Sequence, residues 1–194
     1  MDDISQLPTL LKRRIQAQVI GPIYAEMVAV VGEEAASAIL DSAIRKAAIA
    51  EGKAFAAKAP GGVTSMADFI KVYELWTHDG SLEIEVLEAS DSTFNFDVTR
   101  CRYAESYRAM GLGHIGHLMS CNRDGTFCHG YDPAIKMDRQ HTIMGGAPRC
   151  TFRYSYEGEG QSGSRTGARG ETRMRNRPRS RTRLGPASRT PETG

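Results

Sequence analysis

Leu82-Glu83-Ile84-Glu85-Val86 opens a pair of alternating runs in the middle of the chain, and Phe94-Asn95-Phe96-Asp97-Val98 closes it. Apolar and polar side chains alternate in both runs, with the two-residue period of a β-strand that buries one face. The segment between them, Ala89-Ser90-Asp91-Ser92, is short and rich in turn-forming residues. The sequence therefore predicts a β-hairpin here.

A second hairpin is predicted further along the chain. Its strand candidates are residues 141–144 and 150–154, and Gly145-Gly146-Ala147-Pro148 between them is a turn-forming run. Alternation places the side chain of Cys150 on the core face of the second strand. We expect both hairpins to join one sheet, and we expect four rings to be buried against the same helical layer: Phe94, Phe96, Phe152 and Tyr154.

Helical patterns fill the first third of the chain. Residues 7–31 are rich in Leu, Ile, Val and Ala, and Gly21-Pro22 is expected to kink or split this helix. Gly32 separates it from an alanine-rich helix over residues 33–58, which Pro60-Gly61-Gly62 ends. The packing face of this second helix is predicted from steps of three or four residues, at Ala36, Leu40, Ala43, Ala47, Ala50 and Ala54.

Two more helical patterns lie on either side of the first hairpin. Ser65-Met66-Ala67-Asp68 is a variant of the capping box and predicts a helix that runs to about Trp76. Residues 102–120 are helical in pattern, with an interruption at Gly111-Leu112-Gly113. Helices and two hairpins in mixed order indicate the α+β class, with N-terminal helices packed on one antiparallel sheet.

The length of the chain suits one ordinary core. It has 194 residues, of which 40% are hydrophobic, and this is too short for two comfortable domains. We assign residues 1–155 to a single α+β domain. Residues 156–194 contain only Met174 and Leu184 as large aliphatic side chains, so we expect them to form a disordered tail.

Positive charge is concentrated in this tail. Nine arginines and four acidic residues follow Ser155, although the net charge of the whole chain is only +2. Arginines at every second position from Arg173 to Arg183 suggest phosphate binding, so nucleic acid is a candidate partner through the tail alone. No aromatic platform accompanies the charge, and we favour the interpretation that the tail is a dispensable extension.

The sequence predicts a cytoplasmic location. No run approaches the roughly 20 apolar residues of a membrane span, and the opening Met1-Asp2-Asp3 lacks the basic start and apolar stretch of a secretory signal. In the cytoplasm the four cysteines, Cys101, Cys121, Cys128 and Cys150, are expected to be reduced thiols.

Residues 121–154 hold more ionisable groups than a folding core needs. Cys121 precedes Asn122-Arg123-Asp124-Gly125, a run that predicts a turn. A thiolate beside Arg123 is favoured electrostatically, which makes Cys121 a candidate nucleophile, and Asp124 is a candidate base. The alternative is structural: Cys121 packs in the core and Asp124 caps the turn.

Arg139 and His141 form a second candidate pair. Alternation places both on one side of the approach to the second hairpin. A guanidinium matches a substrate carboxylate bidentately, and an imidazole carries a proton near neutral pH. The alternative is a cross-strand ion pair with a surface histidine.

Two combinations of residues have the chemistry of a metal site. His114, His117 and Cys121 are spaced so that they share one face of a continuous helix. A wider set adds Cys101, Cys150 and His141 to Cys121, although its spacing matches no compact zinc pattern. We favour solvent-exposed histidines, and we expect neither a metal nor a cofactor.

Four elements of the sequence resemble the L-2-amino-thiazoline-4-carboxylic acid hydrolase family. They are the Cys-x-x-Asp element at Cys121, the proline turn Gly130-Tyr131-Asp132-Pro133, the segment Arg139-Gln140-His141-Thr142-Ile143 before a glycine, and the final Cys150-Thr151-Phe152-Arg153-Tyr154. The resemblance extends more loosely back to about Pro22. The sequence departs from the family pattern at Thr151, where that pattern has an aspartate.

The resemblance implies a hydrolase that acts on the carbon–nitrogen bonds of small cyclic amidines. Such an enzyme opens a ring like 2-amino-thiazoline-4-carboxylate to a carbamoyl-cysteine product, so its partner is a small carboxylate substrate. From side-chain chemistry we assign the attack to Cys121 or to water activated by Asp124, proton transfer to His141, and carboxylate binding to Arg123 or Arg139. The alternative function is a non-catalytic domain of the same fold that binds a small ligand or a metal.

Overall fold

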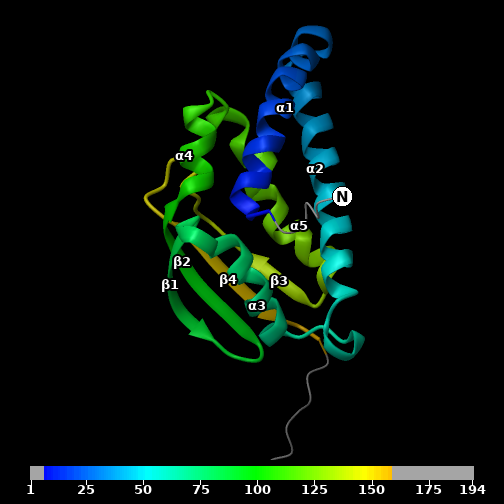
Figure 1. Ribbon diagram of the computed structural model, residues 1–194, viewed down its shortest axis with the longest axis vertical. Coiled ribbons are helices and arrows are strands. Elements are labelled where there is room, and N and C mark those ends of the chain that lie inside the picture. Colours follow the sequence, from blue (N-terminus) through cyan, green and yellow to red (C-terminus); the bar gives the residue numbers. More distant parts are fainter. Residues whose placement is uncertain (1–6, 159–194) are drawn as a thin grey trace, which may run out of the picture. The chain divides into compact units, whose positions relative to one another are not determined.

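The computed structural model describes residues 7–158. Its strands, β1 (Leu82–Ala89), β2 (Thr93–Cys101), β3 (Ile135–Asp138) and β4 (Cys150–Tyr156), form one antiparallel sheet in the order β1-β2-β4-β3. Helices cover one face of this sheet (Figure 1). The prediction of an α+β fold is therefore confirmed.

The first predicted hairpin is confirmed, whereas the second begins earlier than predicted. β1 pairs with β2, as in Val86 opposite Phe96. Residues 141–144 are not a strand, because the chain turns there and Ile143 donates its N–H to the Cys150 thiol, 3.2 Å away. β3 pairs with β4 instead, and its Ile135 side chain is only 1% exposed. The strand that contains Ile135 therefore occupies the position beside β4 that the alternation pattern had assigned to residues 141–144.

An aromatic core lies between the sheet and α3 (Met66–Thr77). The Ser65 hydroxyl accepts the N–H of Asp68 at 3.1 Å, so the predicted cap of this helix is confirmed. Tyr73 lies 4.8 Å from Phe96 between ring centroids, and Phe69 lies 4.9 Å from Tyr154. The four rings expected to share one core are all buried: Phe94, Phe96, Phe152 and Tyr154.

Helix α1 (Thr9–Val31) runs without a break through Pro22, so the expected split at Gly21-Pro22 is wrong. A proline removes one backbone hydrogen bond, and packing on both sides of it holds the helix together, since Ala17 and Tyr24 are both buried. Gly21 serves this packing, because a Cβ there would lie 3.0 Å from the side chain of Leu112.

Helix α2 (Glu33–Ala56) starts after Gly32 as predicted, but much of its predicted face is wrong. Its buried residues follow a strict step of four: Ala36, Leu40, Ile44, Ala48 and Gly52. The alanines predicted beyond Leu40 are exposed instead: Ala43, Ala47, Ala50 and Ala54. The face is set by α5 (Asn122–Tyr131), which approaches so closely that a Cβ on Gly52 would lie 2.3 Å from the Phe127 carbonyl oxygen.

Between β2 and β3 the chain forms several short helical segments. α4 (Arg102–Ala109) ends before the predicted interruption at residues 111–113, and the 3-10 turn η4 (Gly113–Ile115) follows it. The π-helical turn η5 (His117–Cys121) then leads directly into α5. The turn predicted at residues 122–125 is therefore wrong. Tight packing against α2 holds this polar, glycine-containing segment helical, since a Cβ on Gly130 would lie 2.1 Å from the Ile49 carbonyl oxygen.

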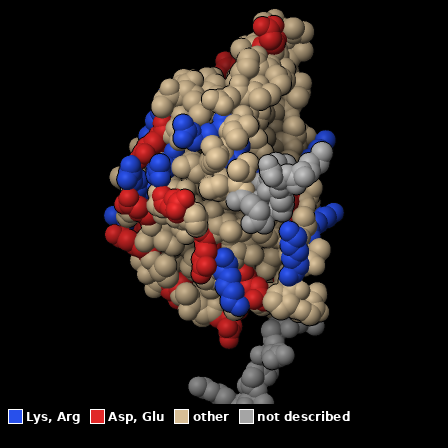
Figure 2. All heavy atoms as spheres, in the orientation of Figure 1, with Lys and Arg blue, Asp and Glu red and all other residues tan. Residues whose placement is uncertain are grey.

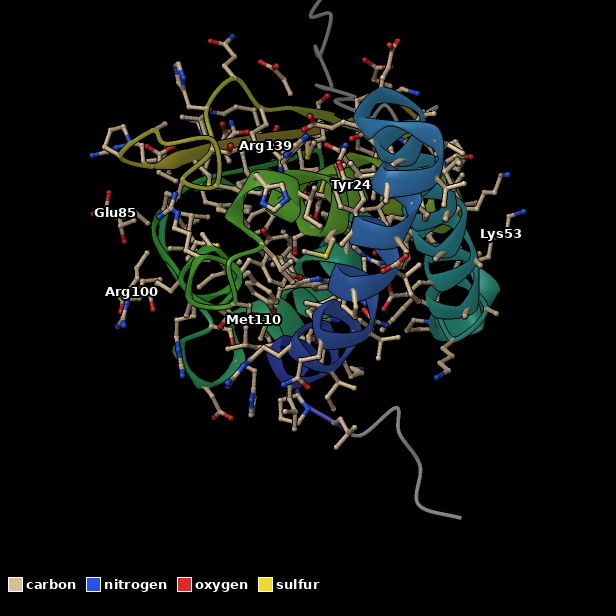
Figure 3. All side chains as sticks on the ribbon, turned by 90° about the horizontal axis from the view of Figure 1, so that it is seen from above. Tyr24, Lys53, Glu85, Arg100, Met110 and Arg139 are labelled. Carbon is tan, nitrogen blue, oxygen red and sulfur yellow. The ribbon has the colours of Figure 1, made fainter. Side chains whose placement is uncertain are left out.

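A second core joins α1 and α2 to α4, η4 and η5. Tyr24 points from α1 into this region (Figure 3), where its hydroxyl lies 2.8 Å from Ser37 Oγ and its ring is 6.2 Å from the ring of His114. Two single turns complete the described helices, η2 (Pro60–Gly62) and η3 (His78–Gly80). None of the helices in residues 7–158 is long and apolar enough to cross a membrane.

Strand pairing reaches one residue past the predicted end of the domain. Tyr156 belongs to β4, faces Ile135 in β3, and donates its N–H to the Ser92 carbonyl at 2.8 Å. Residues 159–194 of the predicted tail lie outside the described residues. The hypothesis of phosphate binding by its arginines is outside them as well.

Candidate active site

Two small cavities, with volumes of about 20 and 50 Å³, lie between the helices and the sheet. They share the lining residues Arg13, Tyr73, Trp76, Arg123 and Asp124, so they adjoin, and together they are called the central cavity. Spaces of this size hold only a few atoms without rearrangement of the walls. Binding of a ligand larger than a few atoms therefore requires the walls of the cavity to move.

Asp124 and Arg139 form an ion pair in the wall of the central cavity. Asp124 lies in the first turn of α5, and Arg139 directly follows β3. The Arg139 guanidinium also donates to the Cys121 carbonyl at 2.8 Å and lies 4.9 Å above the ring of Phe152. Burial raises the pKa of Asp124, and the charge of Arg139 opposes this rise. The carboxylate is thus a stronger base than one in water.

A second group of charges links three helices at the same cavity. Arg13 of α1 donates to both carboxylate oxygens of Glu51 in α2, at 2.9 and 3.1 Å, and Arg123 of α5 donates to one of them. Burial acts to raise the pKa of Glu51, but the charges of Arg13 and Arg123 bring it below its ordinary 4.5. Two guanidiniums share one carboxylate, so this wall has an excess of one positive charge.

The Cys121 thiol lines the cavity, but its electrostatics differ from the sequence-based expectation. Burial raises the pKa of Cys121 to about 12, and the Asp124 carboxylate adds to the effect. Arg123 does not stabilise a thiolate, because its guanidinium is directed to Glu51. The expected lowering of this pKa is therefore wrong. Cys101 and Cys150 line the same cavity, and burial raises their pKa values too.

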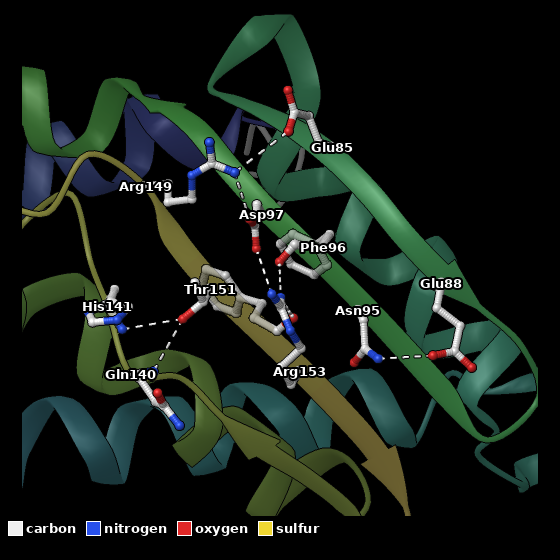
Figure 4. Close-up of polar contacts among 11 residues, drawn as sticks. Glu85, Glu88, Asn95, Phe96, Asp97, Gln140, His141, Arg149, Thr151 and Arg153 are labelled. Carbon is white, nitrogen blue, oxygen red and sulfur yellow. Dashed lines mark hydrogen bonds and ion pairs between the residues drawn. The ribbon is translucent and has the colours of Figure 1, made fainter.

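His141 does not join Asp124 and Arg139. Its side chain is exposed and is absent from the lining of the central cavity. Because residues 141–144 are not a strand, alternation does not bring His141 beside Arg139. Its backbone N–H donates to Thr151 Oγ1 at 3.3 Å on the outer side of β4 (Figure 4). The prediction that His141 transfers a proton in this site is not supported by its position.

Thr151 lies on the face of the sheet that is turned away from the helices (Figure 4). It is opposite Asp97 in the β2–β4 register, and Asp97 is held by Arg149 and Arg153, each at 2.9 Å. Glu85 and Arg100 also project from this side of the molecule (Figure 3). The departure from the family pattern at Thr151 is therefore outside the central cavity.

The first combination considered for a metal is not assembled. His114 and His117 are exposed, whereas Cys121 lines the cavity, because η4 and η5 do not form one continuous α-helix. In the wider set, the three cysteines line the cavity but His141 lies outside it. Within residues 7–158, no group of three or more His, Cys, Asp or Glu side chains is arranged to hold a metal ion.

Arg13 and Glu51 are site residues that the sequence analysis missed. Arg13 is 5% exposed and lies on the buried face of α1 between Leu10 and Ala17, at steps of three and four. This spacing was the available signal, since an arginine on an apolar helical face needs a buried partner. Glu51 gives no comparable signal, because its importance depends on α1 and α5 meeting beside it.

The model of the L-2-amino-thiazoline-4-carboxylic acid hydrolase family matches residues 12–154. The match therefore includes Arg13, Glu51, Asp124 and Arg139, and it ends within β4. The comparison with curated proteins gives no match. A match over this much of the chain shows its family, and the protein belongs to the L-2-amino-thiazoline-4-carboxylic acid hydrolases.

Proposed function

We propose that this protein is a hydrolase that opens a small cyclic amidine or thioimidate, such as L-2-amino-thiazoline-4-carboxylate, to a carbamoyl-cysteine product. Membership of the family supports a hydrolase. The observation that carries the proposal is the central cavity, in which the partly buried carboxylate of Asp124 lies in the same wall as an excess of guanidinium charge. This reaction requires a base that returns its proton to the departing ring atom, and a group that binds the carboxylate.

The substrate carboxylate is assigned to Arg13 and Arg123. Both side chains line both parts of the cavity, and among the described residues 7–158 the carboxylate with which they form ion pairs is that of Glu51. Burial and the neighbouring charge of Arg13 lower the pKa of Arg123, as expected where positive charge is in excess. An anionic ligand in the cavity neutralises this excess, which favours carboxylates over neutral analogues.

The attack is assigned to a water molecule activated by Asp124. The water oxygen forms a bond to the electron-poor ring carbon, and Asp124 accepts a proton from it. The attack opens the carbon–nitrogen double bond onto nitrogen, and the bond from that carbon to the departing ring heteroatom then breaks as the carbonyl forms. The departing atom takes up the proton from Asp124, and the second proton of the water passes to the amidine nitrogen. Arg139 keeps Asp124 in place throughout. This assignment needs no proton carrier at His141.

Direct attack by the Cys121 sulfur is the second candidate. The observation that favours it is that Cys121 and Asp124 line the same cavity; in this candidate mechanism Asp124 accepts the thiol proton. The raised pKa of Cys121 counts against it, because the resting thiol is neutral.

The predicted cytoplasmic location is retained in the proposal, since all four cysteines are unpaired and reduced thiols are typical of that compartment.

The test is to incubate the full chain with L-2-amino-thiazoline-4-carboxylate. Hydrolysis is monitored by mass spectrometry, in which the product is heavier than the substrate by one water. Asp124→Asn is expected to lower turnover by at least about 100-fold, the usual contribution of a general base. The matched control is Asp97→Asn, because Asp97 is also paired with arginines but lies on the other face of the sheet. Its turnover should equal that of the wild type.

Arg123→Lys is expected to raise KM more than it lowers kcat, because its role is assigned to binding. Two results would remove the proposal: wild-type protein that hydrolyses no small cyclic amidine, or Asp124→Asn that keeps full turnover. Saturable binding of L-2-amino-thiazoline-4-carboxylate without turnover would favour the alternative function, a non-catalytic domain that binds a small ligand.

A further inference from the structure

Tyr73 carries a hydroxyl that the proposed mechanism does not use. The residue lies in α3 and is 6% exposed. Its ring packs against Phe96, 4.8 Å away between centroids, and stacks on Trp76 at 5.8 Å. Because these contacts fix the ring, the core sets the position of the hydroxyl oxygen and no hydrogen bond is needed to hold it.

The Tyr73 hydroxyl has no hydrogen-bond partner among residues 7–158, although the hydroxyl of a buried tyrosine usually has one. Tyr103, for example, donates to the Trp76 carbonyl at 3.4 Å. Every fully enclosed side-chain oxygen or nitrogen atom in the described part of the chain does have a partner. The Tyr73 oxygen is therefore not enclosed by protein, and since the residue lines both parts of the central cavity, this oxygen borders the cavity.

Tyr73 differs from the other polar side chains of the cavity wall. The charged groups that line both parts of the cavity already have ion-pair partners. Among the neutral ones, Trp76 is partly exposed to solvent, and Tyr154 lines the smaller part alone. Tyr73 is thus a buried neutral group that borders the cavity beside Asp124 in both of its parts.

The charged side chains outside the cavity form exposed ion pairs. Acidic and basic residues are intermixed on the surface over α4 and the strands β1 and β2 (Figure 2), as where Arg100 pairs with Glu83 and Glu105. Water screens such pairs. A hydrogen-bond donor has a stronger effect on a ligand inside the cavity, where little water is present.

The phenol of Tyr73 keeps its proton. Burial raises the pKa of Tyr73 well above its ordinary value, the Asp124 carboxylate adds to the rise, and Arg139 opposes it. The hydroxyl therefore remains a hydrogen-bond donor over the whole range in which Asp124 acts as a base.

One atom of the reacting group still lacks a protein partner in the proposed mechanism. Arg13 and Arg123 bind the carboxylate, and Asp124 returns its proton to the departing ring atom. The amidine nitrogen remains, and negative charge develops on it when the carbon–nitrogen double bond opens. A fixed donor directed at the atom where charge develops stabilises the transition state.

We infer that Tyr73 is a further catalytic residue, which donates a hydrogen bond to the amidine nitrogen of the substrate as water adds to the ring carbon. This inference rests on the proposed function, because it takes the same substrate in the same cavity. The electron pair of the double bond moves onto nitrogen, and the proton that this nitrogen receives comes from the water. The phenol donates a hydrogen bond throughout and gives up no proton.

The test is steady-state kinetics of Tyr73→Phe in the full chain, with L-2-amino-thiazoline-4-carboxylate as the substrate. Loss of the hydroxyl should lower kcat by about 100-fold, which is typical for the removal of one such donor. KM should stay within about twofold, since the hydrogen bond strengthens only in the transition state. The thermal midpoint should be kept or raised, because the ring remains and the hydroxyl has no protein partner to lose.

The matched control is Tyr131→Phe. Tyr131 is 4% exposed and belongs to the same aromatic core, but it lines neither part of the central cavity. Its turnover should equal that of the wild type. A Tyr73→Phe loss that lies wholly in KM, or that comes with a lower thermal midpoint, would assign the hydroxyl to binding or folding and overturn the inference.

Two further results would overturn the inference while the proposed function stands: wild-type turnover in Tyr73→Phe, or a larger loss in Tyr154→Phe, which would make Tyr154 the donor. Wild-type protein that hydrolyses no small cyclic amidine would remove the proposed function and this inference together. The wild-type assay therefore distinguishes a failure of the function from a failure of the role given to Tyr73.

Discussion

Arg139 holds the carboxylate of Asp124 inside the central cavity, although the two residues belong to different parts of the fold. Asp124 is in the first turn of α5, and Arg139 follows the edge strand β3. The side chain of Arg139 is 9% exposed and that of Asp124 is 23% exposed, so water screens the pair only partly. The pair therefore connects the helical layer to the sheet at the point where we place the chemistry.

Removing one member of this pair should be costly. Arg139→Met is expected to lower the free energy of unfolding by up to about 3 kcal/mol, the lower end of the cost for a fully buried pair, because it leaves a partly buried carboxylate without its partner. Adding Asp124→Asn should recover part of that loss, since the uncompensated charge is then absent. Urea denaturation measures both effects. The control is Arg149→Met, because Arg149 is 51% exposed and its partner Asp97 keeps a second ion pair with Arg153; its loss should stay within about 1 kcal/mol. Strictly additive losses at residues 139 and 124 would contradict this account.

Glu51 should make the protein sensitive to acid. The charges of Arg13 and Arg123 outweigh burial and lower its pKa in the folded state below the ordinary 4.5. A carboxyl with a lowered folded pKa contributes its stability fully above its unfolded pKa and loses it as the pH falls through the folded value. Thermal midpoints should therefore fall below pH 4.5 in the wild type, and Glu51→Gln should fall less steeply from a lower starting value. Parallel pH curves for the two proteins would argue against a charged Glu51.

The sheet was predictable where alternation and burial agree. Phe94, Phe96 and Val98 alternate with polar neighbours and are all buried in β2. The second hairpin was misplaced because residues 141–144 resemble a strand locally, whereas Ile135 and Met137 gain their pairing only when β4 is already beside them. Likewise, α5 is helical over a turn-like sequence because α2 contacts its backbone. These outcomes depend on tertiary contacts that are remote in sequence.

Site residues that lie close together in sequence were predicted, whereas those that are remote in sequence were missed. Asp124, Arg139 and Cys121 were found because they lie close together in sequence and do meet at the central cavity. Arg13 and Glu51 come from separate helices, so their distance from Arg123 in sequence conceals their contact in space. The electrostatic expectation for Cys121 failed for a related reason: the sequence places Arg123 next to it, but the folded chain directs that guanidinium to Glu51.

Thr151 and His141 should be dispensable for turnover. Both lie outside the lining of the central cavity, and Thr151 is on the open face of the sheet. Thr151→Asp and His141→Ala are therefore expected to keep kcat/KM within about twofold of the wild type, well below the loss expected of a catalytic group. Steady-state kinetics on the ring-opening substrate provides the measurement. A large loss in either variant would mean that the site extends to the outer side of β4.

Gly130 should be intolerant of a methyl group. A Cβ at this position would lie 2.1 Å from the Ile49 carbonyl oxygen, which is backbone and cannot rotate away. Gly130→Ala is expected to cost about 1–3 kcal/mol or more, since it forces α5 away from α2. Gly113→Ala is the control, because its Cβ would meet the flexible side chain of Arg108 at 3.1 Å. Comparable midpoints in urea for both variants would show that the two helices pack less tightly than described.

Cys121 should be slow to react in the folded protein. With a pKa raised to about 12, the thiol is ionised in only about one molecule in ten thousand at pH 8, and the thiolate is the reactive form. Limiting iodoacetamide with residue-resolved mass spectrometry should therefore label Cys121 at least about 100-fold more slowly in the native chain than in urea, where a free cysteine has a pKa near 8.5. Native labelling should accelerate as the pH is raised. Rapid labelling of Cys121 near pH 7, together with loss of turnover in a folded Cys121→Ala variant, would transfer the attack from water to the thiol; full turnover in Cys121→Ala would leave Asp124 and water as the reacting pair.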